Sequence, residues 1–179
     1  MQLFFVRHAS IGRRYLGVYI GSTDVSLSKE GIRQAHRLGE FLKAIKINAF
    51  YTSTLKRAVQ TSNVLTEYIS CSPKKVSEIV EISFGDWEGK QSSQVQKEVW
   101  QGESYDKFVK RVQDFLIRII KKHKNDNVLI VAHAGVNREI LRFLLKLSPN
   151  IVVQQDYGCV NMLSINKNEV QIKGINIAV

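Results

Sequence analysis

The sequence predicts an α/β fold: a three-layer α/β/α sandwich with a largely parallel central sheet and an antiparallel C-terminal edge. Two short apolar runs, residues 3–6 and 128–132, have no polar face, which is typical of strands covered on both sides. Segments with helical periodicity alternate with the strand segments along the chain. The 179 residues contain no linker, low-complexity tract or internal repeat, so we expect one domain over residues 1–179.

The composition limits the classes of protein that fit. Lys and Arg outnumber Asp and Glu by 26 to 16, and the net charge of +10 favours an anionic partner: a phosphorylated small molecule, a nucleic acid or a membrane surface. No apolar run approaches the roughly 20 residues that cross a bilayer, and no signal-peptide pattern opens the chain. Cys71 and Cys159 match no metal spacing, so we expect reduced thiols in a cytoplasmic protein.

The first strand runs directly into Arg7 and His8. In open α/β sheets, ligands bind beyond the carboxyl ends of the strands, so this pair is a candidate for chemistry, with a surface charge pair as the alternative. Residues 11–24 are glycine-spaced, basic and without helical period, which predicts a loop that could wrap over this site. Within the loop, Arg13 and Arg14 either attract an anion or are solvated.

The next elements are a helix, a strand and a second helix. Ser28 suits an N-cap for a helix that runs to about Ile45, and His36 falls beside its apolar face as a packed or partly exposed residue. Residues 49–53 predict a strand, and the helical period of residues 54–69 begins at its end. Arg57 therefore lies in a first helical turn, where a phosphate would be a natural partner and simple solvation is the alternative.

The middle of the chain combines a weak strand at residues 75–79 with a structured loop at 81–89. Three acidic residues of this loop, Glu81, Asp86 and Glu88, are candidates for acid/base chemistry. Residues 90–103 are polar and poorly periodic. We expect a short helix and a flap at about 86–104.

A strongly amphipathic helix follows from Ser104 to the region of His123, to which we assign no chemistry. Its second face is basic. We expect that face to be solvated, with nucleic-acid binding as the alternative, because no aromatic side chain is interleaved among the charges. The basic residues are Lys107, Lys110, Arg111, Arg118, Lys121 and Lys122.

Residues 128–133 repeat the opening pattern, since a fully apolar strand again ends in a histidine, His133. A helix is predicted from about Val136 to Lys146, which places His133 between a strand end and a helix start. Residues 158–166 and 169–177 predict a terminal pair of strands that turn near 166–168.

Seven short segments, spread in order over nearly the whole chain, carry the most specific information. In this order they resemble the motifs of the histidine phosphatase superfamily, also called the phosphoglycerate mutase-like family, and the resemblance implies that fold. The segments are Arg7-His8-Ala9, Gly21-x-x-Asp24, Leu27-Ser28-x-x-Gly31, Ser53-x-Leu55-x-Arg57-Ala58-x-Gln60-Thr61, Glu81-x-x-Phe84-Gly85-x-Trp87-Glu88-Gly89, Gly102-Glu103-Ser104 and His133-Ala134-Gly135.

The resemblance implies a cage for a phosphate group. Arg7, Arg57 and His133 would bind the phosphate oxygens, and Gly21 would offer its backbone N–H. His8 would be the nucleophile that forms a phosphohistidine, held by a backbone carbonyl near residues 12–21.

The resemblance also implies that Glu81 is the general acid and then the base. No metal or cofactor is implied, because arginines and histidines supply the positive charge.

The first motif departs from the family pattern. The family usually reads Arg-His-Gly-Glu-Thr, whereas Ala9 and Ser10 follow His8 here. The usual Thr and Asn phosphate contacts after that motif have no clear counterparts.

The resemblance points to a small phosphorylated substrate rather than to a membrane or nucleic acid. Residues 84–88 and 156–159 look most like those of α-ribazole phosphatases, which remove the 5′-phosphate from a nucleotide-loop precursor of cobalamin. Broad-specificity phosphatase and phosphoglycerate mutase remain alternatives, as does a basic nucleic-acid-binding module. The short stretch 90–103 favours hydrolysis over mutase activity, because a small cap leaves a phosphohistidine open to water.

Overall fold

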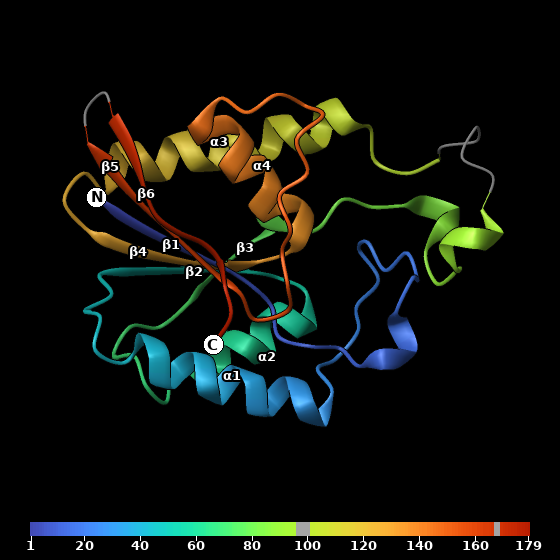
Figure 1. Ribbon diagram of the computed structural model, residues 1–179, viewed down its shortest axis with the longest axis horizontal. Coiled ribbons are helices and arrows are strands. Elements are labelled where there is room, and N and C mark those ends of the chain that lie inside the picture. The colour runs from blue at the N-terminus through green and yellow to red at the C-terminus, as the bar shows by residue number, and fades with distance from the viewer. Residues whose placement is uncertain (96–100, 167–168) are drawn as a thin grey trace.

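The computed structural model describes residues 1–95, 101–166 and 169–179, which form one six-stranded sheet with the order β3-β2-β4-β1-β5-β6 (Figure 1). The strands β1 to β4 run parallel, β5 is antiparallel to β1, and β6 is antiparallel to β5. The predicted parallel sheet with an antiparallel C-terminal edge is confirmed. The strands are β1 (Gln2–Arg7), β2 (Ala49–Ser53), β3 (Lys74–Val76), β4 (Asn127–Ala132), β5 (Val160–Asn166) and β6 (Glu169–Ile177).

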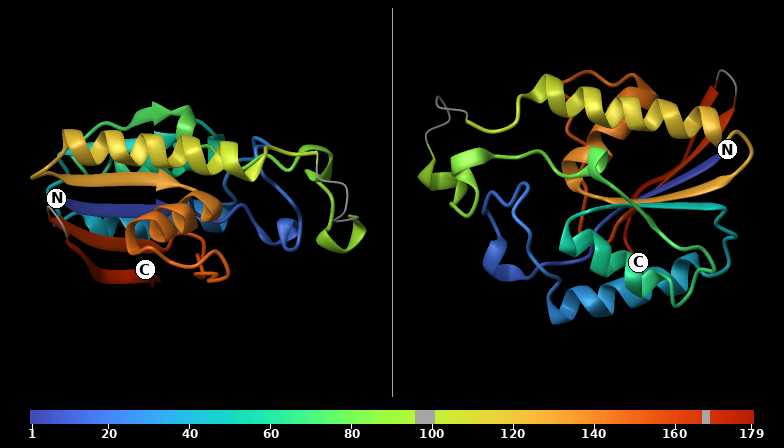
Figure 2. Two further views of the ribbon diagram at one scale, coloured as in Figure 1. Left: turned by 90° about the horizontal axis from the view of Figure 1, so that it is seen from above. Right: turned by 180° about the vertical axis from the view of Figure 1, so that it is seen from behind.

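Two helices cover each face of the sheet, which confirms the three-layer architecture (Figures 1 and 2). Helices α1 (Lys29–Leu42) and α2 (Lys56–Leu65) lie on one face, and α3 (Tyr105–Lys122) and α4 (Ala134–Leu145) lie on the other. No helix within the described ranges is long and apolar enough to cross a membrane.

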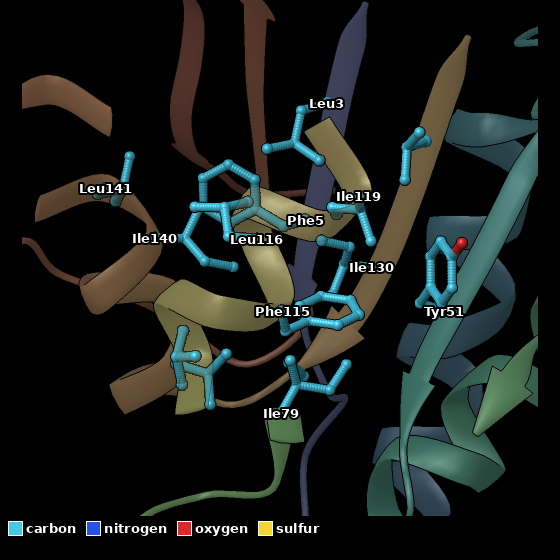
Figure 3. Packing of buried hydrophobic residues seen from close by; sticks show 14 of the residues in the cluster. Leu3, Phe5, Tyr51, Ile79, Phe115, Leu116, Ile119, Ile130, Ile140 and Leu141 are labelled. Atoms are coloured by element: carbon cyan, nitrogen blue, oxygen red, sulfur yellow. The ribbon is translucent and has the colours of Figure 1, made fainter. Parts of the chain in front are cut away.

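Side chains alternate between the two faces along β1, so this strand supplies both cores. Leu3 and Phe5 join the cluster beneath α3 and α4, whereas Phe4 and Val6 join the cluster beneath α1 and α2. Figure 3 shows Phe5 packed among side chains of α3 and α4. Each fully buried side chain of this size contributes about 1.5–3 kcal/mol, which explains why the strand has no polar face.

Several predicted boundaries hold and others shift. The Ser28 hydroxyl accepts a hydrogen bond from the Gly31 N–H as an N-cap. Helix α1 ends three residues before the predicted Ile45, and α2 ends at Leu65, after which the chain continues in turns. The predicted strand over 75–79 is wrong beyond Val76, because its partner strand β2 ends at Ser53, opposite Val76. Residues 77–79 form a 3₁₀ turn that brings Ile79 into the core beneath α3.

The C-terminal segments follow the predicted pattern with small shifts. Helix α4 begins at Ala134, two residues earlier than expected, and His133 occupies its N-cap position. The hairpin of β5 and β6 is confirmed. Of its predicted turn, residues 167 and 168 lie outside the described residues.

Two loop segments extend beyond the carboxyl ends of the parallel strands, at the right of Figure 1. We call residues 11–24 (blue) the first excursion and residues 81–95 (green) the second excursion. Residues 11–24 form the predicted loop, which pairs with the second excursion through an isolated bridge between Val18 and Gln91. The second excursion carries 3₁₀ turns at Gly85–Trp87 and Ser92–Gln94. The predicted flap at 86–104 falls partly on residues 96–100, which lie outside the described residues.

Candidate active site

A cavity of about 380 Å³ opens at the carboxyl edge of the sheet, between the two excursions. The structure places Arg7, His8, Gly21, Arg57 and Glu81 in its lining. Parallel strands explain this convergence, because the ends of β1 and β2 meet at one edge. His133 follows the neighbouring strand β4 and lies fully buried against His8, with the ring centroids 5.2 Å apart.

The His8 ring is held in one orientation. Its Nδ1 lies 2.8 Å from the Ala9 carbonyl oxygen, so Nδ1 carries the proton and Nε2 presents a lone pair. The holding carbonyl therefore belongs to Ala9, and the expectation of a carbonyl within residues 12–21 is wrong. Burial lowers the pKa of His8 well below the usual value for histidine, and the charges of Arg57 and Arg7 lower it further.

Arg57 is buried beside this lone pair. Its Nε donates to His8 Nε2 at 3.1 Å, while Nη1 and Nη2 donate to the carbonyl oxygens of Thr23 and Gly21, each at 2.7 Å. The loop 11–24 thus aims the guanidinium at His8. The Gly21 carbonyl holds Arg57, a contact that the sequence analysis did not predict.

Arg7 is oriented by a segment that the sequence analysis did not include in the site. Its Nη1 donates to the Gln155 carbonyl oxygen at 2.6 Å, and its Cζ lies 3.7 Å from the centroid of the Tyr157 ring. Within the described part of the chain, its buried Nε has no partner. The sequence indicated Tyr157 only through the resemblance of residues 156–159 to those of α-ribazole phosphatases.

His133 carries a second unsatisfied nitrogen. Its Nε2 lies 2.8 Å from the Ser53 hydroxyl at the end of β2, and among the described residues its buried Nδ1 has no partner. Burial lowers the pKa of His133 well below its usual value, and Arg57, His8 and Arg7 lower it further. An unpaired buried nitrogen is unfavourable unless a ligand supplies the missing hydrogen bond.

Of the three candidate acids in the 81–89 loop, the structure places only Glu81 in the cavity lining. Its carboxylate accepts hydrogen bonds from the N–H groups of Gly135, at 3.0 Å, and Ile82, at 3.1 Å. A Cβ on Gly135 would overlap this carboxylate, which explains the glycine after His133.

The other two acids lie elsewhere. Asp86 is exposed, whereas the Glu88 carboxylate accepts hydrogen bonds from Ser22 and Thr23 of the first excursion and from Phe84 of the second. Glu88 thus joins the two excursions through hydrogen bonds. Burial is the largest single cause and raises the pKa of Glu88. Hydrogen bonds from Thr23, Ser22 and Phe84 together outweigh it, so the pKa lies below its usual value.

The cavity has an apolar wall and a third arginine. Tyr19 packs on Phe84 with ring centroids 4.8 Å apart. Arg138 also lines the cavity, and its Nε donates to the Val153 carbonyl oxygen at 3.0 Å. Arg13 and Arg14, for which anion attraction and solvation were the two alternatives, are exposed and do not line the cavity, as the solvated alternative expects. The apolar lining residues are Ile11, Val18, Tyr19, Ile20, Ile82 and Phe84.

The basic face of α3 is partly neutralised by ion pairs. Lys110 pairs with Asp114, and Arg118 pairs with Glu78 on the neighbouring segment. This pairing leaves less free charge for a nucleic acid. In residues 1–95, 101–166 and 169–179, no group of three or more His, Cys, Asp or Glu side chains is arranged to hold a metal ion.

Residues 3–178 match the model of the histidine phosphatase superfamily (branch 1). The chain belongs to this superfamily.

Individual relatives support the assignment and identify the chain as a phosphatase. It is 25% identical over 194 residues to the adenosylcobalamin/α-ribazole phosphatase of Escherichia coli, covering 98% of this chain and 96% of the relative. It is 29% identical to phosphoserine phosphatase 1 of Hydrogenobacter thermophilus, covering 90% and 83%. The crystal structure of the α-ribazole phosphatase from Shigella flexneri superposes with a TM-score of 0.86 at 25% identity, covering 99% and 97% of the two chains.

Two buried imidazoles make the stability of this histidine phosphatase depend on pH. Because the pKa values of His8 and His133 are lowered well below the usual range, the folded protein keeps both rings neutral, while the unfolded chain binds a proton at each below about pH 6.5. The unfolded state then binds more protons, so the free energy of unfolding falls as the pH decreases, by about 1.4 kcal/mol per pH unit for each ring until its folded-state pKa is reached.

Urea unfolding between about pH 7 and about pH 5 measures this slope. His133→Gln should reduce the slope of the free energy of unfolding against pH by about 1.4 kcal/mol per pH unit, the contribution of one ring. His36→Gln changes a partly exposed histidine that contacts Tyr68 and serves as the matched control. An unchanged slope in His133→Gln would contradict a neutral buried ring.

Proposed function

We propose that this phosphatase hydrolyses phosphate monoesters through a phosphohistidine on His8, without a metal, and that its substrate is α-ribazole 5′-phosphate. The observation that carries the mechanism is the hydrogen bonding of the His8 ring at the cavity: Nδ1 is held by the Ala9 carbonyl oxygen, so Nε2 keeps its lone pair and accepts from Arg57 Nε. Covalent catalysis by histidine requires this neutral form with one nitrogen free to attack.

In the proposed first step, the phosphate enters the cage of Arg7, Arg57 and His133. Its oxygens compete with His8 Nε2 for the Nε–H of Arg57 and meet the unpaired nitrogens of Arg7 and His133. Nε2 then attacks phosphorus as the bond to the leaving oxygen breaks, and the three donors stabilise the charge on the phosphoryl oxygens.

Glu81 is the proposed proton carrier. Its carboxyl gives a proton to the leaving oxygen in the first step. In the second step a water attacks phosphorus, Glu81 takes the proton of that water, and the bond between phosphorus and Nε2 breaks to release inorganic phosphate.

The apolar wall supports the α-ribazole substrate. Tyr19 and Phe84 line the same cavity as the arginines of the cage. An ester whose phosphate binds the cage would therefore place its aromatic group against these two rings. The similarity to α-ribazole phosphatases over nearly the whole chain supports the same substrate.

Arg138 favours a second candidate. A third guanidinium in the lining would suit a substrate with a second negative charge, such as the carboxylate of phosphoserine. The similarity to a phosphoserine phosphatase supports this candidate.

Phosphate release from a panel of esters in EDTA tests the proposal. The panel contains α-ribazole 5′-phosphate, phosphoserine, 3-phosphoglycerate and p-nitrophenyl phosphate. We expect turnover in EDTA and the highest kcat/KM for α-ribazole 5′-phosphate. A preference for phosphoserine would select the second candidate. Activity that returns only with added metal would contradict the metal-independent mechanism, and no phosphate release from any ester would contradict the function.

Glu81→Gln should slow substrates according to their leaving group. Benzyl phosphate and p-nitrophenyl phosphate carry aromatic bodies of similar size, but only the benzyl alkoxide needs a proton as it leaves. We expect kcat/KM to fall by about 10²–10⁴ for benzyl phosphate and far less for p-nitrophenyl phosphate. Asp86→Asn, in the exposed neighbour, should change both by less than about twofold. An equal fall for both esters in Glu81→Gln would assign the acid elsewhere.

We further propose that residues 1–179 form a single domain in the cytoplasm. Strand β1 pairs with β5, which unites the two ends of the described chain in one sheet. Cys71 and Cys159 are unpaired thiols, as a reducing compartment allows.

A further inference from the structure

Arg111 differs from the other basic residues of α3, although the sequence places it on the same polar face. Its side chain is 22% exposed, whereas that of Arg118, two turns later, is 56% exposed. The expectation that Arg111 belongs to a solvated face is therefore wrong. Its guanidinium turns toward the segment that carries Glu81.

Every N–H of this guanidinium has an acceptor. Nε and Nη2 each donate to one carboxylate oxygen of Glu103, both at 2.7 Å. Nη1 donates to the carbonyl oxygens of Glu78, at 2.7 Å, and Val80, at 2.6 Å. The remaining Nη2 hydrogen reaches the carbonyl oxygen of Glu81 at 3.3 Å. Three of the five bonds thus hold the backbone that leads into Glu81.

Glu103 contributes to the same arrangement from the other side of the excursion. Its N–H donates to the Ser83 carbonyl oxygen at 2.9 Å, so residues 101–104 are fastened directly to the loop that follows Glu81. Its carboxylate also pairs with the charge of Arg111. This pairing offsets the cost of removing most of the guanidinium from water.

The Glu81 residue is consequently fixed at two levels. The Gly135 and Ile82 N–H groups hold its carboxylate, and Arg111 holds its backbone. A proton donor must lie within hydrogen-bond reach of the leaving oxygen, and a displacement of about 1 Å can lower the rate about 100-fold.

We propose that Arg111 and Glu103 are a positioning pair that holds Glu81 at the leaving-group side of the cavity. This inference rests on the proposed acid role of Glu81. Neither residue lines the cavity, so the pair acts through the backbone of residues 78–81. Lysine cannot replace Arg111 fully, because an ammonium has three donors and lacks the planar fork that meets a carboxylate and several carbonyls at once.

The experiment compares kcat/KM for benzyl phosphate and p-nitrophenyl phosphate in Arg111→Met, Arg111→Lys and Glu81→Gln. We expect Arg111→Met to lower the benzyl phosphate value by about 10- to 100-fold more than the p-nitrophenyl phosphate value, and Arg111→Lys to show a smaller selective loss. Inhibition by vanadate should be unchanged, because the phosphate cage is intact. Arg118→Met is the matched control, since Arg118 binds the side chain of Glu78 instead of its carbonyl.

Each outcome decides between defined alternatives. If Glu81→Gln is leaving-group selective but both Arg111 variants slow the two esters equally or not at all, the positioning role is overturned while the acid role stands. If Glu81→Gln is itself unselective, the proposed acid role fails first. Should Arg111→Met fail to fold, as measured by circular dichroism, Arg111→Lys decides: a selective loss supports the pair, and an equal loss overturns it.

Discussion

Replacement of His8 by alanine is expected to abolish phosphate release while leaving the fold intact. His8 follows the last residue of β1 and its ring faces the cavity, so its removal takes away the proposed nucleophile without emptying either hydrophobic cluster. Removing a nucleophile typically leaves only the catalysis due to the remaining cage, a loss of about 10⁴-fold or more in kcat.

Phosphoenzyme trapping gives the decisive measurement. Brief incubation with ³²P-labelled substrate followed by an alkaline quench should label the native protein with an acid-labile, base-stable phosphate, and His8→Ala should carry no label. His36→Ala alters a histidine of α1 that contacts Tyr68 and does not line the cavity, so this variant should be labelled like the native protein. Label retained in His8→Ala would place the nucleophile on another residue.

Replacement of Arg57 by alanine is expected to have the next largest effect. Arg57 contacts the His8 lone pair and would bind the transferring phosphoryl group, so its loss should lower kcat/KM by about 10²–10³ and weaken vanadate binding in parallel. Lys56→Ala is the control, because Lys56 is the exposed neighbour that pairs with Asp24.

The Arg57 variant also has an expected effect on pH dependence. After burial, the charge of Arg57 is the largest cause that lowers the pKa of His8. Without it the pKa of His8 rises toward the ordinary value, so the nucleophile is protonated at a higher pH and the acid limb of kcat/KM moves upward. An acid limb that stays in place, or a native kcat/KM, would mean that Arg57 does not act on His8.

The strand ends explain why the convergence of several residues of the proposed cage could be predicted. His8 and His133 each follow a buried strand, and parallel strands deliver such residues to one edge. Arg57 could be predicted for a related reason. A cation in the first turn is unfavourable for the helix itself, so its presence there indicates an anionic partner. These positions depend on patterns within a few neighbouring residues, which a sequence displays directly.

Arg111 and Tyr157 could not be predicted in the same way. Helical periodicity does not distinguish Arg111 from Lys110 or Arg118, because most of its partners are backbone carbonyls that every residue supplies. Tyr157 reaches Arg7 through a loop whose path depends on the whole sheet. The carbonyl that orients His8 was misplaced because a sequence does not show local backbone direction.

The location of β1 in the middle of the sheet has a consequence for biosynthesis. Strand β1, which ends at Arg7 directly before His8, is translated well before its neighbours β4 and β5, which lie more than a hundred residues further along the chain. Until β4 and β5 have been made, both edges of a strand with an apolar core at residues 3–6 are unpaired, and unpaired apolar strands favour intermolecular association. We therefore expect nascent chains of this protein to depend on chaperones until β5 emerges, and truncation before β5 to yield aggregates instead of a partly active enzyme.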